Sequence, residues 1–467
     1  MTRPADPSAE RRTMVPSKFI FGLSPVGSAA LRAAPPSRRP PLAPGGSGLG
    51  VRAVVIGSVA TASLAAGLAA AAGTALRHGR PAGRRRFARE VARTVARLGP
   101  TFIKAAQVLG TRRDVVPALL CDELSMLQDD VPPMDAAQSR AALREVYGDR
   151  LDTVFASVEE TPVASGSIAC VYRATLPDGA TVAVKLRRPG IGPQMAADLG
   201  LLRRGASVVA RLPMFRGVPV REVVDSLCES VLGQLDLGRE GRDLDRLRED
   251  LGGVPRVRVP RVHAAASRPA AIVMDFIPDL AVDTGARCPR AMRRTFAAST
   301  LTVVYQMLFI NGFVHCDLHP GNLYFTRSGQ VVVLDAGFSV QLSDKMRGLF
   351  ADFFLNMSIG RGDRCAAIVL ESAIGVADDA DVPAFTEGVK DLVARSYRLS
   401  AKEFSLIAFA GELFDLQRRY GVAASPELVF PLLSLLVVEG TVRSLDPDID
   451  FQETAKPVLN RALFGIR

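Results

Sequence analysis

Residues 315–322 place two imidazoles, a carboxylate and a carboxamide within one short stretch, His-Cys-Asp-Leu-His-Pro-Gly-Asn. The stretch fits the pattern H-x-D-L-x-x-x-N, which is typical of catalytic loops that transfer phosphoryl groups. In that chemistry Asp317 would orient or deprotonate an attacking hydroxyl, and Asn322 would reach a metal ion that bridges the phosphates. Asp317 and Asn322 are therefore candidate catalytic residues, and Asn322 is also a candidate metal ligand.

An apolar run that ends in an acidic residue follows this loop. Residues 331–334 read Val-Val-Val-Leu and precede Asp335, Ala336 and Gly337. A strand that ends in Asp and then Gly is typical of the D-F-G motif, in which the carboxylate holds Mg²⁺. An ordinary apolar strand with a polar turn would look the same in isolation. The two motifs at this separation favour Asp335 as a metal ligand.

A lysine further upstream completes this set of residues. Residues 182–185 read Val-Ala-Val-Lys, which matches V-A-I-K with one conservative change. Lys185 would neutralise the α- and β-phosphates of ATP, and a glutamate on a helix should hold it. Glu240, on a helix expected over residues 226–247, is the candidate. A valine-rich strand with one lysine is usually an edge strand, but the order of the three motifs favours the catalytic interpretation.

The nucleotide loop expected before this strand is unusual. Where G-x-G-x-x-G would stand, the sequence has Ala164, Ser165, Gly166 and Ser167. Small side chains let backbone N–H groups approach phosphates, although alanine makes the loop stiffer than glycine does. We predict that these four residues bind ATP.

The pattern of apolar residues changes along the chain. Helical periodicity covers residues 84–127, with a Gly-Pro break, and residues 134–147. Strand-like runs follow at 162–175 and 181–187, joined by a Pro-Asp-Gly turn. After about residue 290 the pattern is mostly helical again. This order predicts an α+β, two-lobed atypical protein-kinase-like fold with an N-terminal helical extension.

Basic residues gather at the N-terminus. Residues 1–99 hold sixteen Lys/Arg against three Asp/Glu, whereas the whole chain has a net charge of +10. The remainder shows no base-reading motif, so we expect no nucleic-acid partner. The six cysteines occur singly, which argues against a zinc site or a disulfide framework and favours a reducing compartment.

An uncharged segment lies within this basic region, at residues 53–76. As a helix it would be about 36 Å long, enough to cross a hydrocarbon layer of about 30 Å. Its Gly57, Gly67 and Gly73 would let a second helix approach closely. We predict a membrane-crossing or membrane-lying helix. A signal-peptide core, a soluble alanine-rich helix and a disordered extension of the arm are the alternatives.

Three features together resemble the ABC1/UbiB family of atypical kinases. They are the alanine-containing nucleotide loop, the His-Pro-Gly-Asn end of the catalytic loop, and a segment near residue 100. That segment reads Leu-Gly-Pro-Thr-Phe-Ile-Lys-Ala-Ala-Gln over residues 98–107 and Ser-Met-Leu-Gln-Asp-Asp-Val-Pro over residues 125–132. It is similar to the K-x-G-Q region, which in the family folds over the nucleotide site. The resemblance spans residues 98–449 and implies that Lys104 and Gln107 belong to that site.

The sequence departs from the family pattern in the nucleotide loop, where residues 164–167 differ from an all-alanine loop by one glycine, and at three single positions. Ala106 replaces the glycine of K-x-G-Q. Gln234 replaces the glutamate of the family's E-x-D motif, which leaves Asp236 as the carboxylate expected to face Lys104. Ala336 replaces the phenylalanine of D-F-G and removes a ring that normally packs between the lobes. The lysine, glutamate, asparagine and two aspartates assigned above are intact, so the resemblance implies a working nucleotide site.

The expected domains follow from these assignments. Residues 1–50 are a disordered basic arm, 51–78 the membrane helix, 79–150 the helical K-x-G-Q-like extension, 151–279 the kinase N-lobe and 280–467 the C-lobe.

The resemblance also implies a function. Family members are membrane-associated, bind ATP with Mg²⁺ and support isoprenoid quinone or related lipid biosynthesis, by ATP hydrolysis or small-molecule phosphorylation. Expected partners are membrane lipids, isoprenoid quinone or related lipid intermediates, lipid-biosynthesis enzymes and a second copy of the chain, with the kinase domain on the cytoplasmic side. No A-P-E follows residues 335–337 at a short distance, which disfavours a protein kinase. A nucleotide-gated membrane scaffold that transfers no phosphate is the main alternative.

Overall fold

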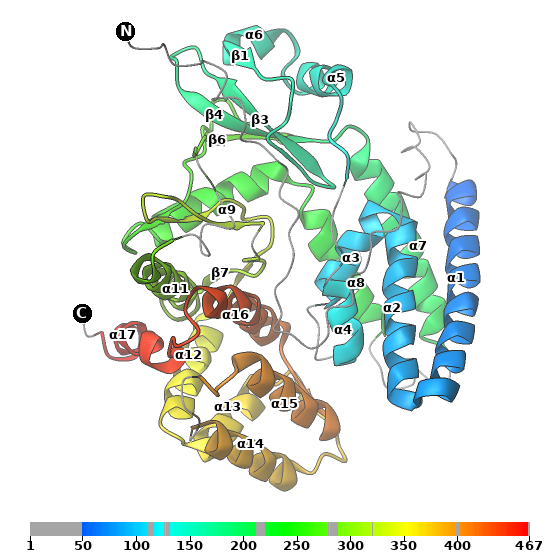
Figure 1. Cartoon of the computed structure of the whole chain (residues 1–467), viewed down its shortest axis with the longest axis vertical. Coiled ribbons are helices and arrows are strands. Elements are labelled where there is room, and N and C mark those ends of the chain that lie inside the picture. Colours follow the sequence, from blue (N-terminus) through cyan, green and yellow to red (C-terminus); the bar gives the residue numbers. More distant parts are fainter. Residues whose placement is uncertain are drawn as a thin grey trace, which may run out of the picture. The chain divides into compact units, whose positions relative to one another are not determined.

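The chain folds into a small β-rich lobe and a larger helical lobe, preceded by a set of helices (Figure 1). The computed structural model describes residues 49–110, 116–125, 127, 131–211, 220–278, 280, 288–319, 321–397, 399 and 402–465. The expected basic arm up to residue 48 lies outside the described residues, as do Met126, residues 128–130 and Pro320.

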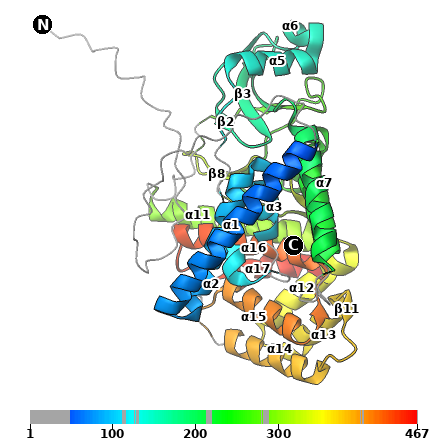
Figure 2. The same cartoon turned by 90° about the vertical axis from the view of Figure 1, so that its right-hand side faces the viewer.

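Among the described residues, four helices precede the small lobe, and the predicted Gly-Pro break separates the second helix from the third. They are α1 (Leu49–His78), α2 (Arg80–Leu98), α3 (Pro100–Gly110) and α4 (Ala118–Ser125). Helices α1 and α2 pack side by side as a hairpin (Figures 1 and 2). A Cβ added at Gly83 would lie 2.6 Å from the Cβ of Ala75, and one at Gly67 would lie 2.9 Å from the Cβ of Glu90. The predicted close approach thus occurs at Gly67.

The small lobe is built on an antiparallel sheet in the order β1-β3-β4-β6, with β2 paired to β3. Its strands are β1 (Ser157–Val158), β2 (Ala164–Ser165), β3 (Ala169–Thr175), β4 (Thr181–Arg187) and β6 (Ala271–Asp275). The single strand expected over residues 162–175 is divided, because a turn closed by Gly166 N–H donating to the Ala169 carbonyl separates β2 from β3.

Alternation along β4 fixes the direction of Lys185. Val182, Val184 and Leu186 are fully buried and pack with helix α5 (Ala136–Tyr147) on one face of the sheet. Because successive side chains of a strand point to opposite faces, Lys185 points to the other face. Two short elements, η2 (Gly148–Arg150) and α6 (Leu151–Val154), connect α5 to β1.

Between β4 and β6, the described part of the chain contains the helices α7 (Ile191–Val209), α8 (Val220–Gly233) and α9 (Leu237–Asp250). The prediction of a single helix over residues 226–247 is therefore wrong. The chain leaves α8 at Gly233, and the Asp236 carboxylate accepts a hydrogen bond from Arg239 N–H at 3.0 Å. This N-cap starts a new helix, which places Glu240 in the first turn of α9.

Short strands surround the predicted catalytic motifs. A three-stranded sheet contains β5 (Val257–Arg258), β9 (Val331–Val333) and β8 (Leu323–Phe325). Two antiparallel pairs join β7 (Phe313–His315) to β10 (Ser339–Gln341) and β11 (Gly375–Val376) to β12 (Val422–Ala423). The predicted strand over residues 331–334 is thus confirmed, one residue shorter.

The large lobe is helical around one apolar core. Its elements are α11 (Arg290–Tyr305), the π-helical η4 (Gln306–Asn311), α12 (Asp344–Ser358), α13 (Gly362–Ser372), α14 (Val382–Tyr397), α15 (Leu406–Arg419), α16 (Pro426–Leu445) and α17 (Phe451–Phe464). Leu435 and Val438 of α16 are fully buried. These residues of α16 therefore belong to the core of the large lobe.

Candidate functional site

Lys185 lies between two carboxylates that come from distant parts of the chain. Its Nζ donates to Glu240 Oε1 at 2.5 Å and to Asp335 Oδ2 at 2.8 Å. Strand β4 supplies the lysine, the first turn of α9 supplies Glu240, and Asp335 follows β9. The three side chains are 17%, 4% and 26% exposed. The structure thus brings together three of the predicted site residues.

The three charges shift one another's pKa values. Burial, together with the nearby Asp335 carboxylate, raises the pKa of Glu240 to about 7. Burial acts to raise the pKa of Asp335 as well, but the Lys185 ammonium outweighs it and holds that pKa below its usual range. Burial opposes the charge on Lys185, yet the attraction of Asp335 and Glu240 raises its pKa. Lys185 is therefore cationic and Asp335 ionised at neutral pH.

Asn322 connects the catalytic loop to the strand that carries Asp335. Its Nδ2 donates to the backbone carbonyl of Asp317 at 2.9 Å, and its own carbonyl accepts a hydrogen bond from Leu334 N–H at 3.0 Å. These two bonds hold Asp317, Asn322 and the residue before Asp335 in one arrangement. The predicted catalytic residues therefore lie close to the predicted metal ligand.

His315 anchors the loop from inside the large lobe. It is fully buried, its Nδ1 accepts a hydrogen bond from Asp317 N–H at 3.2 Å, and its carbonyl accepts one from Ser434 Oγ of α16 at 2.8 Å. Burial lowers the pKa of His315. The other histidine of the motif, His319, lies at the surface with Nε2 3.7 Å from Asp317 Oδ2.

The nucleotide loop is clamped by a residue that the sequence analysis missed. Arg188 is 8% exposed. Its guanidinium donates to the Gly166 carbonyl at 2.9 Å, to Ser165 Oγ at 2.8 Å and to the Pro132 carbonyl at 2.7 Å. Ser165 Oγ in turn donates to the Val131 carbonyl at 2.9 Å. Residues 131–132, which belong to the K-x-G-Q-like extension, are thereby fastened to the loop.

The two matched residues of the K-x-G-Q-like run have different surroundings. Gln107 Nε2 donates to the Leu127 carbonyl at 2.9 Å and so holds α3 to the segment that follows α4. Lys104 lies near enough to Glu240 to lower the pKa of that carboxyl, as the smallest of several contributions. Among the described ion pairs, Lys104 has none with Asp236, whose carboxylate caps α9.

Comparison with known proteins agrees with this arrangement. The family model for the ABC1 atypical kinase-like domain matches residues 126–368, more than half of the chain, and the model for the UbiB helical domain matches residues 389–450. The chain belongs to the ABC1 atypical kinase-like family.

A solved structure supports the same fold. Rv3197 from Mycobacterium tuberculosis, determined in complex with erythromycin, is 20% identical to this chain with a TM-score of 0.54. The match covers 71% of this chain and 84% of that chain. At this identity the likeness concerns the fold alone, and it confirms the predicted two-lobed, kinase-like architecture.

The departures from the ABC1 pattern are all in packed positions. Ala336 is fully buried in the large-lobe core, and Ala106 packs against Ala92 and Leu124. Gln234 is 9% exposed in the turn between α8 and α9. In this ABC1 chain the substituted side chains therefore fill space in the interior of the protein.

Asp335 and Asn322 form a donor set that suits Mg²⁺. Magnesium prefers oxygen ligands and often takes one or two from the protein and the rest from phosphates and water. Among the described residues, no group of three or more His, Cys, Asp or Glu could hold a metal ion by itself. A Cβ added at Gly337 would lie 3.0 Å from Asp335 Oδ1 and 3.5 Å from Glu240 Oε2. The glycine keeps that space free, so these residues fit Mg-ATP.

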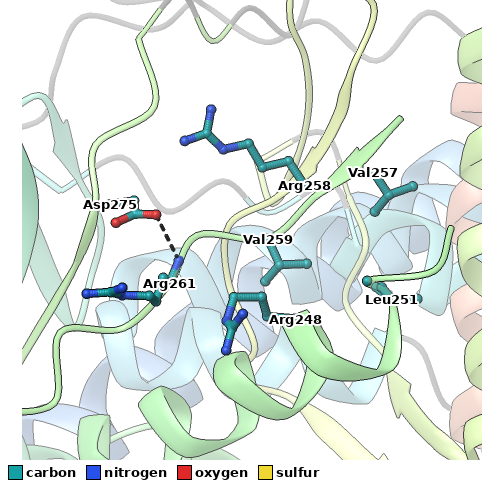
Figure 3. Close-up of a pocket in the computed structure, with 8 residues that line it drawn as sticks. Arg248, Leu251, Val257, Arg258, Val259, Arg261 and Asp275 are labelled. Carbon is teal, nitrogen blue, oxygen red and sulfur yellow. Dashed lines mark hydrogen bonds between the residues drawn. The ribbon is translucent and has the colours of Figure 1, made fainter. Parts of the chain in front are cut away.

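A separate pocket of about 300 Å³ is lined by none of the predicted site residues, and Figure 3 shows its lining. Its lining comes from the end of α9, from β5 and from the end of β6: Arg248, Leu251, Gly252, Val257, Arg258, Val259, Arg261 and Asp275. Asp275 Oδ2 accepts a hydrogen bond from Arg261 N–H at 3.3 Å. The lining carries more cationic than anionic side chains.

Proposed function

We propose that this chain binds Mg-ATP between its lobes and uses it at a membrane, in isoprenoid quinone or related lipid metabolism. The observation that carries the proposal is the double ion pair of Lys185 with Glu240 and Asp335, at 2.5 and 2.8 Å. An ammonium held this way is positioned to bind the phosphates of a nucleotide. The lipid pathway is proposed from membership of the ABC1 family.

Each residue has a distinct role in this proposal. Lys185 binds the α- and β-phosphates, and Glu240 orients it. Asp335 and Asn322 hold the metal ion, which supplies charge neutralisation of the phosphates. Asp317 orients or deprotonates the attacking water or hydroxyl.

The short connection after Asp335 supports a small acceptor. Residues 336–343 connect this residue to α12; they include β10 and Ser343, whose Oγ accepts a hydrogen bond from Met346 N–H at 3.4 Å and caps the helix. An ordinary protein kinase presents its peptide substrate on a long activation segment between D-F-G and A-P-E. Water or a small lipid-like hydroxyl is therefore the acceptor that we propose, in place of a protein.

Membrane association is proposed from helix α1. Within the described residues, Gly50–His78 is the one helix long and apolar enough to cross a membrane, and its most apolar 18 residues have a mean hydropathy of 1.9. The kinase domain would then lie on the cytoplasmic side, where ATP is available.

The test is Mg²⁺-dependent ATP hydrolysis by the full chain, with and without liposomes. Asp335→Asn removes a metal ligand and should lower hydrolysis by about 100-fold or more. Asp152→Asn makes the same chemical change on exposed α6 and should leave hydrolysis unchanged. Tight ATP binding by the wild type without any turnover would refute the catalytic proposal and favour the scaffold.

A further inference from the structure

Helix α1 presents an uncharged face to the outside along its whole length. Residues 53–76 include no charged side chain, and large apolar side chains are exposed at both ends and between them. Val54 is 70% exposed, Leu68 57% and Leu76 89%. At 1.5 Å per residue, the face between Val54 and Leu76 is about 33 Å long. An exposed apolar patch of this extent marks a binding surface.

The opposite face of α1 is fixed to charged parts of the protein. Ser63, Gly67 and Ala71 are buried there. Arg97 of α2 donates to Ser63 Oγ at 3.1 Å. At the N-terminal end of α1, Arg52 donates to the fully buried Asp198 of α7 at 2.7 and 2.8 Å.

This packing is incompatible with a helix that crosses a bilayer. Helix α2 runs beside α1 and contains seven arginines and one glutamate. A membrane-crossing α1 would carry these arginines into the hydrocarbon layer, where each charge is strongly unfavourable. Placed flat on the surface, α1 can bury its apolar face while α2 stays at the level of the head groups.

The charges at one end of the apolar face indicate the surface that it fits. Arg77, Arg80, Arg84 and Arg85 are all exposed around the turn of the hairpin, which follows the exposed Leu76. Exposed arginines at the end of an apolar helix attract anionic lipid head groups. The complementary partner is therefore an anionic bilayer surface.

We infer that α1 lies in the plane of an anionic lipid surface and does not cross it. This rests on the membrane association in the proposed function and specifies its geometry. The apolar face enters the boundary between head groups and acyl chains, and the arginines at the hairpin turn contact the head groups.

The chain contains no tryptophan, so single tryptophans can report depth directly. Val54, Ala65 and Leu76 are exposed and eleven residues apart, which places them about 16 Å apart on nearly the same side of the helix. Each is replaced by Trp in the full chain. Ile374→Trp, at a 69% exposed position of the large lobe, is the control.

Fluorescence quenching by lipids brominated at different acyl depths is then measured on vesicles with and without phosphatidylglycerol. We expect equal, shallow depths of about 5–10 Å at all three positions and no quenching at the control. A tryptophan at residue 65 that lies deeper than both others by about 10 Å or more would overturn the inference, because this is the profile of a crossing helix. Absence of quenching, or burial of the tryptophans by self-association without lipid, would overturn it as well. ATP hydrolysis by the same samples without lipid reports separately on the proposed function.

The arginines provide a second measurement. Arg84→Gln with Arg85→Gln should weaken binding to phosphatidylglycerol vesicles by about 10-fold or more. Arg418→Gln with Arg419→Gln, on exposed positions of α15, should have no effect. Equal binding by both double variants would show that the hairpin does not face the lipid.

Discussion

A buried ion pair should decide whether the α1–α2 hairpin stays attached to α7. The Arg52 guanidinium donates to Asp198 at 2.7 and 2.8 Å, and Thr101 Oγ1 donates to the same carboxylate at 2.9 Å. Asp198 is fully buried, whereas 28% of the Arg52 side chain is exposed. We expect strong coupling in the double-mutant cycle of Arg52→Met and Asp198→Asn.

The magnitude follows from the burial of the pair. Hydrogen bonds to charged groups contribute about 1.5–3 kcal/mol, and removing one partner of a buried ion pair costs about 3–5 kcal/mol. Solvent at Arg52 screens part of the attraction, so the lower figures apply. We expect a coupling free energy of about 1.5–2.5 kcal/mol. Each single variant should raise the opening constant of the hairpin by about 10-fold or more.

Hydrogen exchange of the α1 and α2 amides measures this free energy of local opening. The pair Arg203–Asp225, which joins α7 to α8 at 2.9 Å with side chains 39% and 56% exposed, is the matched control. Its cycle, Arg203→Met with Asp225→Asn, should give a coupling below about 1 kcal/mol. Equal coupling in the two cycles would refute the argument that burial of Asp198 makes the anchor strong.

Three further predictions follow from the described contacts. Arg188→Met removes three hydrogen bonds that clamp the nucleotide loop and should raise hydrogen exchange at residues 164–167 by about 10-fold or more. Burial lowers the pKa of His315, so as the pH falls its imidazole is protonated in the unfolded chain before it is protonated in the folded chain. The free energy of unfolding should therefore fall below pH 6.5 by at most about 1.4 kcal/mol per pH unit. The Tm of His315→Gln should decrease less steeply with falling pH than that of the wild type. Gly83→Ala places a Cβ 2.6 Å from Ala75 and should cost about 1–3 kcal/mol in urea unfolding.

Each of these predictions has a matched control. Arg173→Met, on the neighbouring strand at a 49% exposed position, should leave the loop exchange unchanged. His78→Gln, at an exposed position, should keep the wild-type pH dependence. The raised pKa of Glu240 acts in the opposite direction, because the folded chain takes up that proton first, so only the difference between variants is informative. A Cβ added at Gly73 has no atom within 4 Å, so Gly73→Ala should raise the free energy of unfolding by up to about 1 kcal/mol. If any of the three test variants gives the same result as its control, the contact on which its prediction rests does not have the proposed effect.

Motifs of fixed local spacing could be predicted from the sequence. Asp335 follows an apolar strand, and Lys185 lies on a strand whose other side chains alternate, so both positions follow from nearest neighbours. Within the catalytic loop, the bond from Asn322 to the Asp317 carbonyl spans five residues. The bond from Ser434 to the His315 carbonyl crosses more than a hundred residues and could not be predicted in this way.

Contacts across long sequence separations could not be predicted in the same way. Arg188 donates to the Pro132 carbonyl, 56 residues earlier in the chain, and no pattern near residue 188 indicates that partner. The break between α8 and α9 had a local signal, the capping residue Asp236. The break between α8 and α9 could not be seen in the apolar pattern, because the helical period of apolar residues continues from one helix into the next.

The orientation of α1 is a further case in which composition is insufficient. A helix that crosses a bilayer and one that lies on its surface can have the same length. Only the packing partner separates them, and here that partner is α2 with its seven arginines. The period of those arginines is visible in the sequence, but the side of α1 against which they pack is not.

Loss of the D-F-G ring changes what can couple the two lobes. Ala336 is fully buried and carries no ring that could move between lobes. One described connection between the lobes is electrostatic: Lys185 of the small lobe bonds Asp335 of the large lobe and Glu240 of α9 at once. Phosphates that bind Lys185 compete with Asp335 for the same ammonium, and a metal ion that binds Asp335 competes with Lys185. Under the proposed function, nucleotide binding therefore replaces the Lys185–Asp335 ion pair with contacts of Lys185 to the phosphates and of Asp335 to the metal ion. Because Glu240 also binds Lys185, this change reaches α9.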